Sequence, residues 1–172
     1  MGPTGIVKPG SVIGPALTGL IMASAPQGKP QEAKYSKAIA SAFGSAWQLW
    51  HMGLLGTLMY PPFAAFPAPV APPMPNVPVP LITFSSGSEA MLSPGSLLGF
   101  MVGNLGDPQA LHATYLFDSI AGAFNPVFLI FKSTTLVKNV LGTGPVPTFA
   151  PPFVPVGPVM GGTGNGAPGC LS

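Results

Sequence analysis

Residues 38–60 read AIASAFGSAWQLWHMGLLGTLMY, a run of 23 residues without a charged side chain. The apolar residues in this region recur at spacings of 4, 4, 3, 4 and 4, which places them on one face of a helix. They are Ile39, Phe43, Trp47, Trp50, Leu54 and Leu58. Pro30 and Glu32 suit the first turn of this helix, and Pro61-Pro62 stops it. The pattern predicts a helix over residues 30–60.

Charged residues are scarce along the whole chain. Only 6% of the 172 residues are Asp, Glu, Lys or Arg, and 47% are apolar. About 25% charged residues is usual in soluble domains, and interspersed charges keep an isolated domain in solution. The composition therefore predicts that most of the outer surface is covered, either by other protein subunits or by lipid.

Proline and glycine are abundant, with 24 and 23 residues. A content this high usually indicates disorder, but disorder goes with low hydrophobicity and high net charge. Here the mean hydropathy is +0.51 and the formal net charge is only +2. We therefore predict ordered, extended segments that lie along neighbouring chains.

The sequence repeats itself in the same order across its length. PGSVIG at 9–14 recurs as PGSLLG at 94–99, IASAF at 39–43 recurs as IAGAF at 120–124, and LGT at 55–57 recurs at 141–143. FAAFPAPV at 63–70 is echoed by FAPPFVPV at 149–156. The offsets of 85, 81 and 86 residues are close to half of the chain length. The matches predict a tandem duplication, with chance similarity between segments rich in Pro and Gly as the alternative.

The predicted fold is mainly α, with few or no regular strands. It consists of two tandem pseudo-repeats, 1–86 and 87–172, and each is a helical hairpin followed by an extended proline-rich arm. In the first repeat we expect helices at about 15–24 and 30–60. The prolines of residues 61–84 forbid a helix and favour a polyproline-like arm there.

The second repeat is predicted to follow the same plan. Ser93 and Pro94 open a helix over about 94–104, and Asp107-Pro108 open another over 108–124. We expect Asn125-Pro126 to end this helix and residues 127–131, VFLIF, to form a buried strand. The arm of this repeat is predicted at 144–160, followed by a flexible glycine-rich tail at 161–172.

The uncharged run at 38–60 is long enough to cross a bilayer, which takes about 20 residues. The matching region of the second repeat, however, carries Asn125-Pro126, Lys132 and Lys138. A charge at the bilayer centre costs about 2.5–3.5 kcal/mol or more, and proline-rich backbone lacks the internal hydrogen bonds that hydrocarbon demands. The sequence favours a helix buried in protein, with membrane contact by one half as the alternative.

Residues suited to catalysis or metal binding are few and widely spaced. The acids and histidines show no spacing typical of a metal site or a carboxylate pair, and they are Glu32, Glu89, Asp107, Asp118, His51 and His112. GGTGNG at 161–166 lacks the lysine of a P-loop. Six scattered lysines and no arginine argue against nucleic acid. We predict no enzymatic activity, no cofactor and no metal site.

The architecture predicts a structural role. We expect a non-enzymatic subunit of a large symmetric assembly, by analogy a virion or a phage-like contractile tail, baseplate or injection machine. A homo-oligomer is expected, and a trimer of duplicated subunits matches a sixfold ring by pseudo-symmetry. The side chains expected at subunit interfaces are Phe43, Trp47, Trp50, His51, Leu54, Phe63, Phe66, Phe149 and Phe153.

Two other classes of function stay open at this point. One is a small integral membrane protein, a pore or anchor built from two parallel repeats. The other is an adaptor whose proline arm binds a peptide-recognition domain. Residues 1–15 lack a basic segment before an apolar block, so we expect no signal peptide and assembly of the particle in the cytoplasm. The single cysteine, Cys170, excludes an intrachain disulfide and leaves an intermolecular one as the alternative.

Overall fold

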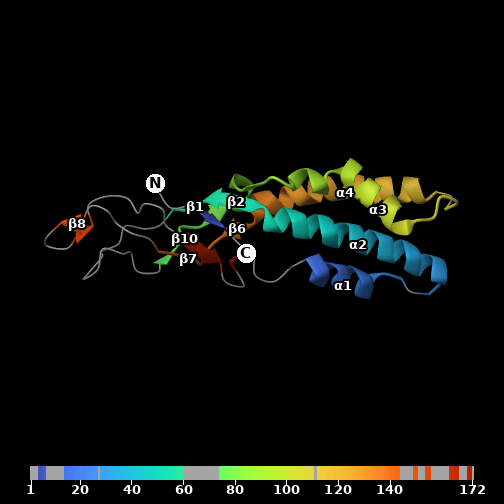
Figure 1. Ribbon diagram of the computed structural model, residues 1–172, viewed down its shortest axis with the longest axis horizontal. Coiled ribbons are helices and arrows are strands. Elements are labelled where there is room, and N and C mark those ends of the chain that lie inside the picture. The colour runs from blue at the N-terminus through green and yellow to red at the C-terminus, as the bar shows by residue number, and fades with distance from the viewer. Residues whose placement is uncertain are drawn as a thin grey trace. The chain divides into compact units, whose positions relative to one another are not determined.

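The computed structural model describes residues 4–6, 14–26, 28–59, 74–110, 112–143, 149–150, 154–155, 163–166 and 170–171. These residues contain four α helices and ten short strands (Figure 1). The prediction of a mainly α fold is confirmed.

The chain divides into two compact units. The helical unit comprises Val12–Gly53 and Ser86–Phe131, and the strand unit comprises Met1–Ser11, Leu54–Ser85 and Lys132–Ser172. Each unit draws on both predicted halves, so the compact units differ from the halves 1–86 and 87–172. The duplication concerns the sequence and stays a prediction.

Four α helices and a 3-10 turn make up most of the helical unit. They are α1 (Gly14–Ser24), α2 (Pro30–Met52), η2 (Glu89–Leu92), α3 (Pro94–Leu105) and α4 (Ala113–Thr134). Helices α1 and α3 occupy the places predicted for the two short helices. The Ser93 side chain accepts a hydrogen bond from the Ser96 N–H at 3.4 Å, and Pro94 follows at the first helical position, which explains why α3 begins there.

Helices α1 and α2 pack at very short distance. The Gly14 N–H donates to Gln48 Oε1 at 2.9 Å, and the Thr18 hydroxyl donates to the Ala40 carbonyl at 3.2 Å. Residue numbers rise along α1 while they fall along α2, so the two helices are antiparallel. A Cβ atom on Gly44 would collide with Thr18 Oγ1. Glycine at position 44 therefore sets how closely the helices approach.

Helix α2 contacts α4 through aromatic rings. Tyr35 meets Phe117 with ring centroids 5.8 Å apart, Phe43 meets Phe124 at 4.9 Å, and Trp50 meets Phe128 at 5.2 Å. The residue numbers rise together in these pairs, so α2 and α4 run parallel. Edge-to-face geometry of this kind adds to the burial of large apolar area. Figure 1 shows α2 lying beside the other three helices.

The predicted helix over 30–60 is too long. Helix α2 ends at Met52, because Gly53 follows as its cap and donates its N–H to the Leu49 carbonyl at 3.3 Å. Residues Leu54–Thr57 instead form strand β2, which finds an antiparallel partner in the N-terminal segment. The regular apolar spacing continued past residue 52, but pairing with a distant strand decides the conformation there.

The predicted helix over 108–124 has both boundaries wrong. The Asp107 carboxylate accepts the Gln109 N–H at 3.1 Å and forms a turn, and His112 has a left-handed φ of 65°, so α4 begins only at Ala113. The helix then continues through Pro126 to Thr134.

The predicted strand at 127–131 is also wrong. Pro126 removes one backbone donor, but it lies on the exposed side of α4. Phe128 and Phe131 both contact the Trp47 ring, with centroids 6.3 and 5.7 Å away. These contacts hold the segment after the proline in a helical conformation.

The strand unit consists of strands of two to four residues. They are β1 (Thr4–Ile6), β2 (Leu54–Thr57), β3 (Met74–Pro75), β4 (Val79–Pro80), β5 (Ser85–Ser86), β6 (Leu136–Val137), β7 (Val140–Thr143), β8 (Phe149–Ala150), β9 (Val154–Pro155) and β10 (Thr163–Gly166). They form sheets in the orders β1-β2-β5, β10-β7-β3, β4-β6 and β8-β9. A 3-10 turn, η1 (Leu81–Thr83), follows β4.

The described part of the first proline-rich arm lies along its own chain. Met74 pairs with Gly142 and Val79 pairs with Val137, so residues 74–80 run antiparallel to β7 and β6. These described residues are extended, and their strand partners belong to the same chain. Residues 61–73 lie outside the described residues.

Two short described parts of the second arm pair with each other. Phe149 pairs with Pro155 and Ala150 with Val154, so β8 and β9 form an antiparallel pair. The rest of the predicted arm 144–160 lies outside the described residues. The tail predicted as flexible contributes strand β10, and the Cys170 carbonyl accepts the Lys138 N–H at 2.8 Å. Pairing with β7 and with the segment after β6 holds these parts of the tail.

Two strand pairs share one register. Thr4 lies opposite Thr57 and Gly5 opposite Gly56, while Thr163 lies opposite Thr143 and Gly164 opposite Gly142. Both central strands, β2 and β7, carry the repeated word LGT, and both partners carry the word TG. A slip of one residue would change every pairing. The two strand pairs therefore align TG with LGT in the same way.

Candidate interaction surface

The interface residues predicted from the sequence lie mainly inside the chain. Trp50 and Leu54 are fully buried, Phe43 is 8% exposed and His51 is 6% exposed. Their own chain covers these side chains, so they contribute to its core, and the surface left for a partner lies elsewhere. Trp47 is half-buried between Trp50 and Phe131.

The remaining predicted interface residues belong to the two arms. Phe149 lies in β8, where only the backbone is described, and Phe63, Phe66 and Phe153 fall outside the described residues. The structure therefore brings together the four aromatic and histidine residues of α2 and leaves the phenylalanines of the arms without a described side-chain environment.

Ionisable groups do not gather into a site in the described part of the chain. No group of three or more His, Cys, Asp or Glu residues is placed there to hold a metal ion. The side chain of the buried Asn76 is hydrogen-bonded to backbone at Val77, Val137 and Val140. The fully buried Trp50 indole N–H has no acceptor among the described residues. None of these groups forms a recognisable catalytic arrangement.

An exposed apolar face of the helical unit lies on α4. Leu116, Ala123, Val127 and Ile130 are exposed and follow one another at spacings of 7, 4 and 3, which places them on one face of the helix. We call these four residues the α4 stripe. Val127 and Ile130 are each 60% exposed.

The α4 stripe has polar and apolar neighbours on the same helix. Asp118 and Asn125, seven residues apart, form a polar edge of α4, and both are exposed. Tyr115 and Leu129 are also exposed, but Leu129 follows Asn125 by four residues and lies beside it on the polar edge, away from the stripe. A contiguous exposed apolar surface marks a site where a protein meets another protein, a membrane or a ligand.

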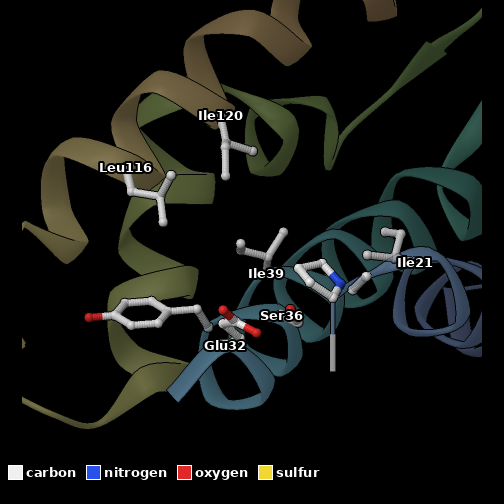
Figure 2. Close-up of a pocket in the computed structure, with 9 residues that line it drawn as sticks. Ile21, Glu32, Ser36, Ile39, Leu116 and Ile120 are labelled. Carbon is white, nitrogen blue, oxygen red and sulfur yellow. The ribbon is translucent and has the colours of Figure 1, made fainter. Parts of the chain in front are cut away.

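An apolar groove adjoins the stripe at Leu116. It has a volume of about 320 Å³ and lies between α1, α2 and α4. Figure 2 shows Ile21, Ile39, Leu116 and Ile120 around it, with Glu32 and Ser36 at the α2 side. Since the exposed surface of its lining is mostly apolar, the groove suits apolar side chains, and Glu32 and Ser36 alone form no set of reacting groups.

The predicted elements do not contain this surface. A helix end at Asn125-Pro126 separates Leu116 and Ala123 from Val127 and Ile130. The signal was nevertheless present, because the four apolar residues keep helical spacing across the proline.

Helix α4 also meets a membrane criterion. Among the described residues it is the one helix long and apolar enough to cross a membrane by length and composition, and only 17% of its most apolar window is buried. Comparisons of the chain with protein-family models, with curated proteins and with solved structures find no match. The function must therefore be argued from the surface itself.

Proposed function

We propose that the protein is a non-enzymatic structural subunit of a large symmetric protein assembly, in which neighbouring subunits cover the α4 stripe and the adjoining groove. The observation that carries this proposal is the exposed apolar stripe on α4, on a chain with only 6% charged residues. By analogy, we propose that this assembly is a virion or a phage-like contractile tail or injection machine.

Protein covers this surface better than a bilayer does. The uncharged part of α4 between Asp118 and Lys132 has 13 residues, or about 20 Å at 1.5 Å per residue. The hydrocarbon core of a bilayer is about 30 Å thick. Asn125 and Pro126 lie in the middle of this span. A protein partner tolerates these polar and irregular positions, whereas lipid penalises them.

The uncharged run at 38–60 is also better suited to a protein environment than to a bilayer. Its helical part ends at Met52, so the uncharged helix after Lys37 has 15 residues, or about 22 Å. Strand β2 follows directly. In the hydrocarbon region of a bilayer every backbone N–H and C=O must be hydrogen-bonded within the protein. A short strand in an open three-stranded sheet leaves some of these groups unpaired.

We also propose that the chain consists of two pseudo-equivalent repeats. Three observations support this. Each half contains a short helix followed by a long one, α2 and α4 run parallel, and β2 and β7 receive a TG strand in the same register. Two similar faces in one chain allow a subunit to make similar contacts twice, which is useful in rings of even symmetry.

Native mass spectrometry and electron microscopy of the purified protein test the proposal. We expect a defined oligomer whose mass is a multiple of the 17.4 kDa chain, and particles with cyclic symmetry. A stable, soluble monomer at micromolar concentration would overturn it. Carbonate extraction of membranes from expressing cells separates the membrane alternative, because an integral protein stays in the pellet and an assembly subunit is released.

A further inference from the structure

A segment near residue 165 matches the first residues of the sequence. Residues 2–12 read GPTGIVKPGSV, and residues 161–171 read GGTGNGAPGCL, with five identities in eleven positions. The words PGSV at 9–12, PGSL at 94–97 and PGCL at 168–171 mark three such segments. The first two open the proposed repeats, so residues 161–171 resemble the opening of a third.

The two strands that contain LGT, β2 and β7, differ in where their TG partner lies along the chain. Strand β2 receives β1, which precedes it in the same repeat, whereas β7 receives β10, which follows it. The position of the second repeat that matches Thr4 is Glu89, which lies in the 3-10 turn η2. The second repeat therefore has no TG strand before its helices, and residues 163–166 supply one.

We propose that copies of this protein associate by strand exchange, in which β1 of one copy pairs with β7 of a second copy and β10 of the second copy pairs with β2 of the first. The partner is a second copy of this chain. The inference deepens the proposed assembly role and rests on it. Because both pairs have the same register and the same TG and LGT words, an exchanged strand keeps its alignment.

The exchange conserves backbone hydrogen bonding. Each copy gives up its internal β1–β2 and β7–β10 pairings and gains β1–β7 and β10–β2 pairings with its neighbours, so each of these strands keeps a partner. Strands β1 and β10 also lie in contact within the strand unit, so both donors reach the same region. An exchange that repeats from copy to copy is head-to-tail, and such contacts close into rings or continue as filaments.

Disulfide trapping in full-length chains tests the exchange. Two chains of different mass carry Cys170→Ser, and one also carries Thr4→Cys while the other carries Thr143→Cys. After mixing, assembly and mild oxidation, we expect a disulfide-linked heterodimer between positions 4 and 143. A Thr4→Cys chain mixed with a Gly87→Cys chain is the control, since Gly87 is exposed and belongs to none of the paired strands.

The outcomes separate this inference from the proposed function. If native mass spectrometry shows the oligomer but position 4 links to position 143 no more than to position 87, strand exchange is wrong and the assembly role stands. A link from position 4 to Thr57→Cys of another copy, without a link to position 143, also overturns the inference. A monomer without links overturns both.

A segment replacement gives a second readout that does not depend on trapping. Residues 161–171 of the full chain are replaced by GPTGIVKPGSV, the sequence of residues 2–12. We expect the replaced chain to assemble and to melt within about 5 °C of the natural chain, which corresponds to roughly 1–2 kcal/mol. A chain with the same eleven residues in scrambled order is the control. Equal destabilisation of both chains would contradict the equivalence of the two segments.

Discussion

Asn76 and Val140 are joined by two hydrogen bonds. The Asn76 side-chain carbonyl accepts the Val140 N–H at 2.9 Å, and the Val140 carbonyl accepts the Asn76 backbone N–H at 3.2 Å. The Asn76 amide also donates to the Val137 carbonyl at 2.9 Å. One side chain from the first proline-rich arm thus satisfies both sides of the turn between β6 and β7, 64 residues away in the sequence.

Substitution of Asn76 is therefore expected to destabilise the strand unit. Asn76→Ala leaves the buried Val140 N–H without its acceptor, at a cost of about 1–3 kcal/mol. Asn104→Ala is the matched control, because Asn104 is exposed and its amide makes a single 3.4 Å bond to the Ala38 carbonyl. Urea denaturation followed by circular dichroism measures both variants. Equal stability losses would show that the Asn76 bonds have no special role.

The close approach of α1 and α2 predicts opposite effects for two glycines. In Gly44→Ala the new methyl group collides with the Thr18 hydroxyl, and such overpacking costs about 1–3 kcal/mol. Gly99 in α3 has no atom within 4 Å of an added Cβ, so Gly99→Ala is expected to stabilise by roughly 0.5–1 kcal/mol through helix propensity. Thermal melts of the two variants give the signs. A neutral Gly44→Ala variant would argue against the tight helix contact.

The aromatic contacts between α2 and α4 predict a large effect at Trp50. This side chain is fully buried and meets Phe128, so Trp50→Ala is expected to cost about 3–5 kcal/mol. Tyr115→Ala is the control on α4, because Tyr115 is 77% exposed and a change there is expected to stay within about 0.5 kcal/mol. Chemical denaturation of both variants gives the comparison. Similar losses at the two positions would contradict the assigned core.

The α4 stripe predicts where assembly is sensitive to charge. Ile130→Lys places a cation in the apolar surface and is expected to weaken self-association at least tenfold, or about 1.4 kcal/mol. Asn125→Lys introduces the same charge on the polar edge of α4 and is expected to leave association within about twofold. Analytical ultracentrifugation measures both, with circular dichroism to show that the helices are intact. Sensitivity at Asn125 but not at Ile130 would place the interface on another face.

The burial of Cys170 predicts a protected thiol. The side chain is 1% exposed, and its backbone carbonyl binds the Lys138 N–H. Labelling by a thiol reagent is expected to be more than tenfold slower in the native protein than in urea, since buried structural cysteines are inert. Non-reducing electrophoresis is expected to show no disulfide-linked dimer of the natural chain. Rapid native labelling would mean that residues 170–171 leave β6 readily.

The helical part of the fold was largely predictable. The short helices at 15–24 and 94–104 were confirmed to within a residue at each end, because proline, serine and glycine signals act locally. The proline in α4 was misread. An interior proline costs about 3 kcal/mol, and the contacts of Phe124 and Phe128 with rings of α2 outweigh this cost. Propensity could not reveal those contacts, because they join residues about 80 positions apart in the sequence.

The candidate interface residues were also only partly predictable from the sequence. The sequence predicts Phe43, Trp50 and Leu54 at subunit interfaces, and the structure buries all three within their own chain. The sequence could not tell whether their own chain or another subunit buries them. That distinction depends on α4 lying parallel to α2, and no local pattern encodes the packing direction of two helices.

The sequence by itself determined the scarcity of charge, the order of short and long helices, and the repeated LGT and TG words. Only the tertiary structure decided that α2 stops at Met52, that Pro126 stays inside a helix, and that Thr143 lies opposite Thr163, which follows it in the chain, instead of a residue that precedes it. The physical reason is the distance along the sequence over which each interaction acts. Helix periodicity and caps act within about four residues, whereas strand register and helix packing are fixed by partners that are distant in the chain and close only after folding.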